Sequence, residues 1–197
     1  GEVCTSGGEP VTIKNAVCMH EEDMGVLWKH TDRRLATPEV RRSRRLVISS
    51  MATVENYEYG FFWYLYQDGN IEYEVKMTGI LSLGTLEHDS SSGDPPYGTM
   101  IAPKLYAPNH QHFFNMRLDM DVGGATNSVY RVDVVGDEPS EANPFFNAFQ
   151  AKKTLLKTEK QARDDLNLDT DRTWKIVNRN VLNATGMPIG YKFFPGV

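Results

Sequence analysis

The most constraining feature of the sequence is a pair of β-type segments joined by a turn. Residues 56–66 are dense in tyrosine, phenylalanine and tryptophan, which favour extended strands. Residues 70–76 alternate in character, as half-buried strands do. Between them, Asp68 and Gly69 supply the positive φ angles that a tight hairpin turn requires. The sequence therefore predicts an antiparallel hairpin over residues 56–76.

Other segments of β character recur along the chain, separated by clusters of Gly, Pro, Ser and Asn. Together they predict a mainly β protein, built as a large antiparallel β-sandwich. Residues 148–166 are the exception, because their Ala, Lys, Gln, Glu and Leu favour a helix, although Thr154 and Thr158 weaken that prediction. The remaining predicted strands are residues 11–17, 45–50, 77–83, 112–121, 128–135 and 173–178.

Length and charge narrow the classes of function. A chain of 197 residues is long enough to bury one core. Its 26 acidic and 21 basic side chains give a net charge of -5, which does not favour a nucleic-acid partner. The longest apolar run, residues 60–66, is far shorter than the ~20 residues that span a bilayer, so we expect no membrane partner. The arginine-rich segment 33–45 is expected at the surface.

The first chemical signal is the triplet His110-Gln111-His112. In an extended strand the side chains of residues i and i+2 leave the same face, so two histidines at this spacing can converge on one metal ion. The alternative is a pair of partly exposed strand histidines without a metal. The spacing alone leaves both interpretations open.

The second signal is residues 53–59, Thr-Val-Glu-Asn-Tyr-Glu-Tyr. This segment resembles the Asn-Tyr-Glu/Asp-Tyr motif that marks the cofactor tyrosine of the copper amine oxidases. Without that resemblance, Tyr57 would pass as one more strand aromatic. Further segments similar to the family follow in family order, so the resemblance covers essentially the whole chain; they are residues 18–23, 28–32, 97–99, 109–112, 117–121 and 172–174.

The resemblance implies an enzyme that uses dioxygen to convert primary amines to aldehydes, releasing ammonia and hydrogen peroxide. Tyr57 would be the precursor of topaquinone, a quinone that forms at the copper site without a second enzyme. His110 and His112 would bind Cu(II), to which neutral imidazoles are suited. Asn56 would help to fix the orientation of the quinone.

The resemblance also implies a peripheral cation site and a disulfide. Asp119, the main-chain carbonyl of Met120 and Asp121 would bind calcium or a similar ion, since hard oxygen ligands suit such cations. The alternative is a pair of loop carboxylates facing water. Cys18 matches one half of a family disulfide whose usual partner is expected upstream of Gly1, so a bond to Cys4 is not predicted.

Several parts of the family's catalytic site are expected outside this sequence. The third copper histidine would follow Val197, and the catalytic aspartate would precede Gly1. His20, His30 and His88 match no copper-ligand position of the family. We therefore expect residues 1–197 to be a segment of a single catalytic β-sandwich domain, inactive alone, from a subunit that forms a homodimer. An extracellular, peroxisomal or cytoplasmic location stays open, as does the preferred amine.

Two other interpretations compete with the oxidase. An iron oxygenase of the double-stranded β-helix type could use a His-x-His pair, but it leaves the Asn-Tyr-Glu-Tyr motif unexplained. A cation-dependent β-sandwich binding module could use Asp119 and Asp121 without any catalysis. Copper together with a quinone at residue 57 would distinguish the oxidase from both.

Overall fold

The described part of the chain forms two compact units built from β-strands. The computed structural model describes residues 2–87, 95 and 97–196, divided between the units Gly1–His112 and Phe113–Val197. Every regular element in these residues is a strand, and every strand pairing is antiparallel. The predicted mainly β, antiparallel fold is therefore confirmed. Among the residues searched, no helix is long and apolar enough to span a bilayer.

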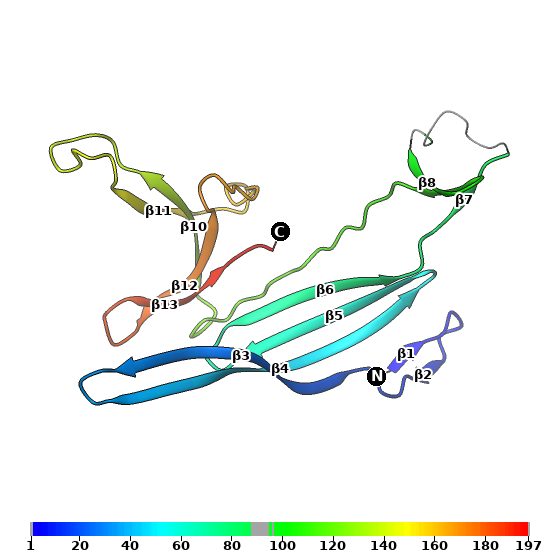
Figure 1. Ribbon diagram of the computed structural model, residues 1–197, viewed down its shortest axis with the longest axis horizontal. Helices are drawn as coiled ribbons and strands as arrows, with labels where there is room; N and C mark the ends of the chain where they lie inside the picture. Colours follow the sequence, from blue (N-terminus) through cyan, green and yellow to red (C-terminus); the bar gives the residue numbers. More distant parts are fainter. Residues whose placement is uncertain (1, 88–94, 96, 197) are drawn as a thin grey trace. The chain divides into compact units, whose positions relative to one another are not determined.

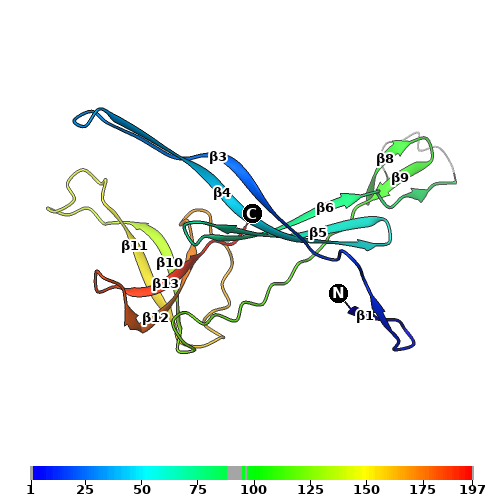
Figure 2. The ribbon, with the colours of Figure 1, turned by 90° about the horizontal axis from the view of Figure 1, so that it is seen from below.

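The unit Gly1–His112 is dominated by one four-stranded sheet in which each strand lies beside its chain neighbour (Figure 1). Its strand order is β3-β4-β5-β6, as three successive hairpins require. The first two strands run on as a two-stranded ribbon beyond the end of β5 (Figure 2). The bounds are β3 Cys18–Asp32, β4 Thr37–Val54, β5 Tyr57–Tyr66 and β6 Ile71–Gly79.

The turn between β5 and β6 lies where the sequence predicts it, but only Gly69 has the expected positive φ angle and Asp68 does not. Gly69 has a φ angle of 87°, and the amide of Tyr66 donates to the carbonyl of Asn70 at 3.0 Å. The Asp68 side chain accepts a hydrogen bond from the Asn70 amide at 3.0 Å, which closes the turn from the other side. The hairpin predicted over residues 56–76 is therefore confirmed.

Strand β3 was not predicted, and the arginine-rich segment that follows it is a strand rather than an irregular surface. Residues 37–45 belong to β4, where most side chains are exposed as expected. Acidic residues on β3 pair with these arginines: Arg42 with Asp23 at 2.7 Å, and Arg45 with Glu22 at 2.8 Å. Cross-strand charge pairs thus stabilise a segment whose residues have little strand propensity of their own.

Two smaller sheets complete this unit. One contains β1 Glu2–Cys4 and β2 Pro10–Thr12, and the other has the order β7-β9-β8, with bounds Gly84–Thr85, Leu105–Pro108 and Gly98–Ala102. The strand predicted for residues 11–17 is shorter than expected, since β2 ends at Thr12. The separate strand predicted for residues 77–83 is wrong, because residues 77–79 are the end of β6 and residues 80–83 are irregular. After β9 the chain is irregular from residue 109 to 127. The strand predicted for residues 112–121 is wrong, because alternation becomes a strand only where a neighbouring strand edge is available.

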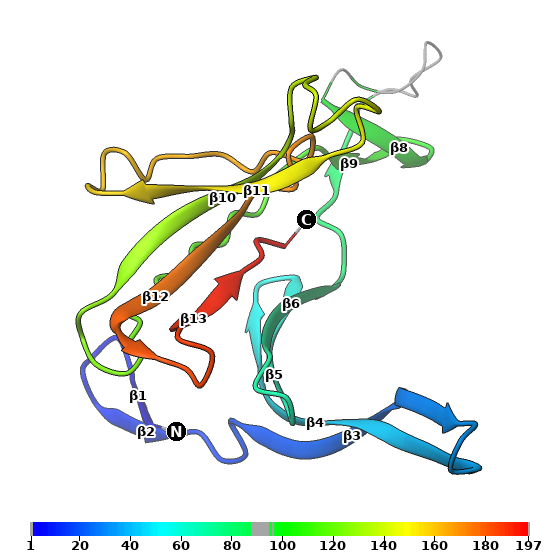
Figure 3. The same cartoon turned by 90° about the vertical axis from the view of Figure 1, so that its left-hand side faces the viewer.

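The unit Phe113–Val197 is a four-stranded sheet with the order β11-β10-β12-β13 (Figure 3). The strands predicted for residues 128–135 and 173–178 are confirmed. The helix considered for residues 148–166 is wrong, since residues 149–156 pair along the edge of β10 and the residues after them form turns. The bounds are β10 Ser128–Gly136, β11 Phe149–Leu156, β12 Thr173–Leu182 and β13 Pro188–Phe193.

Each unit has a small core. Val47 and Tyr64 are buried in the sheet of the first unit, and Val122, Val132 and Ile176 are buried in the second. In the first unit the guanidinium of Arg45 covers this core, lying 3.6 Å from the centroid of the Tyr64 ring. Many large apolar side chains stay exposed on the sheets, including Met51, Trp63 and Met77.

Candidate metal centre

Tyr57 is the first residue of β5, and the hairpin before it fixes its position. β4 ends at Val54, and Val54 and Tyr57 face each other across a two-residue turn in which Glu55 has a φ angle of 53°. The carbonyl of Asn56 accepts a hydrogen bond from the amide of Ile80 at 2.8 Å. A side chain at Gly79 would collide with that carbonyl and with the Tyr57 main chain, and Gly79 also has a φ angle of 108°. The end of β6 therefore packs closely against this turn.

Two tyrosine–histidine pairs lie at the start of β5. The hydroxyl oxygen of Tyr57 is 2.8 Å from Nε2 of His110, and that of Tyr59 is 2.8 Å from Nδ1 of His112. Both pairs join residues that are 53 positions apart, so residues 110–112 run alongside residues 57–59 in the same direction. In each segment the two side chains leave the same face, as residues i and i+2 of an extended chain do.

The Tyr57 ring lies beside both imidazoles. Its centroid is 5.5 Å from that of His110 and 5.0 Å from that of His112, and the two imidazole centroids are 4.8 Å apart. The amide of Ser82 also points to the Tyr57 hydroxyl, at 3.4 Å. Tyr57 and His112 are half-buried, whereas His110 is exposed. The structure thus brings together the three predicted site residues that carry rings, although residues 110–112 are not part of a strand.

The hydrogen bonds of His110 define which of its nitrogens carries a proton. Nδ1 lies 3.1 Å from the carbonyl oxygen of Pro108, which can only accept, so Nδ1 is the donor. Nε2 is then unprotonated in the neutral ring, and the Tyr57 hydroxyl donates to it. A histidine whose second nitrogen donates to a carbonyl is the usual form of a metal ligand.

These donor atoms fit a copper ion. Imidazole nitrogens and oxygen donors are the ligand types that Cu(II) takes in tetragonal sites. Nε2 of His110 and the Tyr57 hydroxyl oxygen, 2.8 Å apart, are donors of these two types. Within the residues searched, no cluster of three or more His, Cys, Asp or Glu could hold a metal. His110 and His112 could therefore supply two ligands of a larger set.

The structure does not add the other predicted site residues to this group. Asn56 is adjacent in the turn and is held through its main chain. Asp119, Met120 and Asp121 lie in the irregular start of the other unit, where Asp119 is 3.5 Å from Arg117 and its side chain is 86% exposed.

Of the other histidines and cysteines that the structure describes, Cys4 lies on β1, and Cys18, His20 and His30 lie on β3. His20 bonds to Glu22 on β3, at 3.0 Å, and His88 is outside the described residues. Cys4 and Cys18 are both free and exposed thiols, so the described residues contain no disulfide between them.

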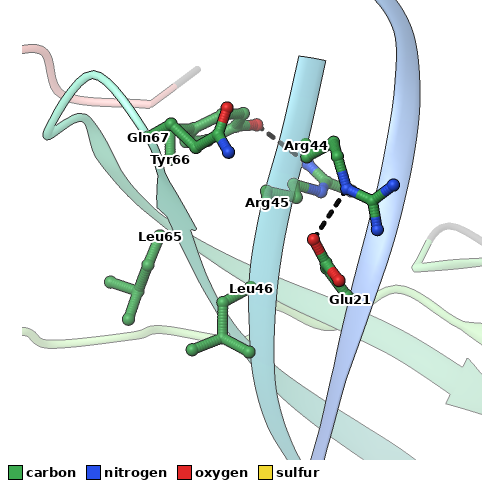
Figure 4. A pocket seen from close by; sticks show the side chains of 7 residues that line it. All are labelled: Glu21, Arg44, Arg45, Leu46, Leu65, Tyr66 and Gln67. Atoms are coloured by element: carbon green, nitrogen blue, oxygen red, sulfur yellow. Dashed lines mark hydrogen bonds and ion pairs between the residues drawn. The ribbon is translucent and has the colours of Figure 1, made fainter. Parts of the chain in front are cut away.

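A pocket of about 360 Å³ on the same sheet involves none of the predicted site residues (Figure 4). Arg44 donates to Glu21 at 2.7 Å, and Arg45 donates to Tyr66 at 2.9 Å, so the cations in its wall already have partners. The lining residues are Glu21, Arg44, Arg45, Leu46, Leu65, Tyr66 and Gln67.

Sequence reasoning missed three contributors to the centre. Tyr59 was treated as a strand aromatic, although it stands two residues after Tyr57, as His112 stands two residues after His110. This matching spacing was the only signal available. Pro108 and Ser82 contribute main-chain atoms, which no side-chain pattern reveals.

The chain is similar to proteins of known activity along its whole length. The family model described as copper amine oxidase, enzyme domain, matches residues 1–197. Diamine oxidase [copper-containing] 1, peroxisomal, of Nicotiana tabacum is 51% identical over 189 residues, which cover 94% of this chain and 24% of the relative. Histamine oxidase of Arthrobacter globiformis is 48% identical over 188 residues, covering 95% of this chain and 27% of the relative.

Comparison of the fold with solved structures identifies the same group of proteins. The crystal structure of a copper-containing benzylamine oxidase from Hansenula polymorpha matches with a TM-score of 0.86 and 34% identity, covering all of this chain and 31% of that one. The present chain therefore spans about a quarter of the length of the curated relatives that it matches, between 24% and 27% for the two above.

Proposed function

Because the chain belongs to the copper amine oxidase family, we propose that it is part of the catalytic domain of an enzyme that oxidises primary amines. The reaction consumes the amine, water and dioxygen and yields an aldehyde, ammonia and hydrogen peroxide. Relatives are named for diamine, histamine and methylamine, which share a primary amino group. The observation that carries the proposal is the Tyr57 ring beside both imidazoles, with its hydroxyl 2.8 Å from Nε2 of His110.

In this proposal His110 and His112 bind copper through Nε2, together with ligands from outside residues 1–197. Bound copper supplies the redox and Lewis-acid chemistry that, with dioxygen, turns Tyr57 into topaquinone. Pro108 holds His110 so that its bare Nε2 and the Tyr57 oxygen face each other. The Tyr57 hydroxyl proton lies between these two atoms, and Nε2 of His110 would have to give up this hydrogen bond in order to bind a metal.

We assign Asn56 to the orientation of the Tyr57 ring. Its carbonyl is tied to the amide of Ile80 at 2.8 Å, and Gly79 allows β6 to approach the turn closely. The residue beside the ring therefore has little freedom to move. A rigid neighbour is what a reactive ring needs if one of its faces is to be presented to substrate.

We further propose that Asp119, Asp121 and the carbonyl of Met120 bind a peripheral calcium ion. Two carboxylates and a main-chain carbonyl are ligands of the right type, and both carboxylates are exposed. Calcium should raise the melting temperature of the full-length protein, and D119N should remove that increase. Equal melting temperatures with calcium and with chelator would contradict this site.

A homodimer is the proposed assembly of the full-length subunit. The β3–β4 ribbon carries exposed apolar side chains, among them Met24, Leu27 and Trp28. Exposed apolar clusters of this kind favour a protein partner over open solvent. Sedimentation of the full-length protein measures the assembly, and a monomer at micromolar concentration would contradict it.

The function is tested by removing one oxygen atom. Tyr57→Phe keeps the ring and the strand but lacks the oxidisable hydroxyl, so redox-cycling quinone stain and amine-dependent peroxide release should both disappear. Tyr73→Phe, on β6, makes the same chemical change away from the histidines and should retain both signals. Amine oxidation by the Tyr57→Phe protein would refute the assignment, and a wild-type protein without copper or quinone would favour a binding module.

A further inference from the structure

Tyr59 has a place in the centre that the proposed function does not require. We propose that Tyr59 is a positioning residue for copper, because its hydroxyl oxygen is placed to accept a hydrogen bond from Nδ1 of His112, which would leave Nε2 of that ring free for the metal. This inference rests on the proposed function and adds a residue that controls one of its ligands.

The geometry of this contact is well defined. The Tyr59 hydroxyl oxygen is 2.8 Å from Nδ1 of His112, and the ring centroids are 5.8 Å apart. Tyr59 is paired with Ala52 of β4 on one side and with Met77 of β6 on the other, so its main chain is fixed by two neighbouring strands. Tyr59 and His112 are both half-buried, which limits competition from water for the hydrogen bond.

The two histidines differ in what decides their tautomer. The partner of His110 is a carbonyl, which can only accept, so the fold itself keeps the proton on Nδ1. The partner of His112 is a hydroxyl, which can accept or donate, so either tautomer satisfies the contact. Only the tautomer with the proton on Nδ1 leaves Nε2 unprotonated for a metal. A copper ion would require this tautomer, and Tyr59 provides the acceptor for its Nδ1 proton.

The same argument separates the two phenols on one face of β5. The Tyr57 oxygen faces Nε2 of its histidine, the nitrogen that binds metal, whereas the Tyr59 oxygen faces Nδ1, the nitrogen that does not. Tyr57 therefore lies where the ligands converge, and Tyr59 lies behind one of them. This difference in position assigns the oxidation to Tyr57 and the supporting role to Tyr59.

The test is Tyr59→Phe in the full-length protein, with Tyr66→Phe as the matched control. Tyr66 is on the same strand, and its hydroxyl bonds to Glu72 and Arg45. Competition with a chelator should show copper bound about 10- to 100-fold more weakly in Tyr59→Phe and unchanged in Tyr66→Phe. The Cu(II) electron paramagnetic resonance spectrum should change in Tyr59→Phe only.

A second measurement needs no metal. In protein with ¹⁵N-labelled histidine, Tyr59→Phe should shift His112 towards the tautomer protonated on Nε2 and leave His110 protonated on Nδ1. Wild-type copper affinity together with an unchanged His112 tautomer would overturn the inference. Absence of copper or quinone from the wild-type protein would instead refute the proposed function.

A double-variant comparison separates this role from general loss of folding. If Tyr59 acts through His112, then Tyr59→Phe should not weaken the residual copper binding of a His112→Ala protein any further. An equal loss of affinity in both backgrounds would show that Tyr59 does not act through this ligand.

Discussion

At the scale of single residues, what separates Tyr57 from the other aromatics of β5 is the atom that its hydroxyl faces. The hydroxyl of Tyr64 donates a hydrogen bond to Glu74, and that of Tyr66 donates one to Glu72, so both hydroxyls bind carboxylates on β6. Tyr57 donates to an imidazole nitrogen that is held unprotonated by a main-chain carbonyl. These surroundings support the proposal that Tyr57, and neither Tyr64 nor Tyr66, is the cofactor precursor.

His110→Ala should therefore remove both the partner of Tyr57 and a proposed copper ligand. We expect copper content after dialysis and quinone stain to fall together, while the secondary structure is kept because His110 is exposed. His20→Ala is the matched control, since His20 is an exposed histidine bonded only within β3, to Glu22 and Cys18. Full copper content in the His110→Ala protein would exclude His110 as a ligand.

The pair of histidines in this centre could be predicted from the sequence, because it depends on local chain geometry. The spacing of His110 and His112 shows that two imidazoles can share a face, and this convergence depends only on local chain geometry. Contacts between residues 53 positions apart are not encoded locally, so the pairing of Tyr59 with His112 required the structure. Tyr57 itself was identified by its resemblance to a family, since its ordinary β-strand context carries no chemical signal.

At the scale of elements, the centre depends on how closely β6 approaches the turn between β4 and β5. The position of the turn at Asp68 and Gly69 could be predicted from the sequence because it depends on local conformation, although only Gly69 takes the positive φ angle expected of both residues. Strand β3 could not be predicted from its own residues, because its acidic side chains are stabilised in a strand by ion pairs with the arginines of β4. The helix considered for residues 148–166 was wrong for the same reason, because residues 149–156 form a strand by pairing with β10.

Gly79→Ala should disturb the centre without touching its side chains. The new methyl group would meet the Asn56 carbonyl and the Tyr57 main chain, at a φ angle of 108° that L residues rarely adopt. Gly69→Ala is the control, because its φ angle is 87° but no atom lies within 4 Å of the added carbon. Backbone strain costs about 1–3 kcal/mol in either variant.

Only Gly79→Ala adds a steric clash, so it should have the lower unfolding free energy in chemical denaturation. It should also form quinone more slowly than Gly69→Ala. If the two variants lose equal stability and form quinone at equal rates, the close approach of β6 does not position Tyr57.

In the second unit, Asp133 links β10 to the segment before β12. Its carboxylate is 2.8 Å from Nε of Arg172 and 2.9 Å from Nε of Arg131, and it accepts a hydrogen bond from Thr170. Burial alone would raise the pKa of Asp133, but the hydrogen bonds from Arg172 and Thr170 and the charges of both arginines outweigh it. The pKa of Asp133 therefore lies below its ordinary value.

A group whose pKa is lowered by folding stabilises the protein above its unfolded pKa, which is about 3.9 for aspartate. That contribution is lost as the pH falls through the lowered value. Asp133→Asn should thus cost about 2 kcal/mol of unfolding free energy at neutral pH. The difference from wild type should shrink towards acid pH, below about pH 4. Urea titrations at several pH values measure it, and a difference that grows towards acid pH would contradict this sign.

At the scale of the whole molecule, the two units present sheets that are only partly covered. Met51, Trp63 and Met77 on the first sheet, and Tyr191 and Phe193 on the second, are more exposed than core residues of a finished domain. The chain covers 24% to 27% of the two curated relatives described above. We expect further segments of the catalytic domain to pack on these faces and to supply the remaining ligands.

The central claim is that Tyr57 lies beside copper held by His110 and His112, and one measurement tests it directly. Metal-free full-length protein is mixed with Cu(II) without oxygen, then exposed to dioxygen, and the peptide that contains residue 57 is analysed by mass spectrometry before and after. We predict unmodified tyrosine before exposure and a quinone at residue 57, but not at residue 59, after it. Copper-loaded protein in which Tyr57 stays unmodified after dioxygen would contradict the account.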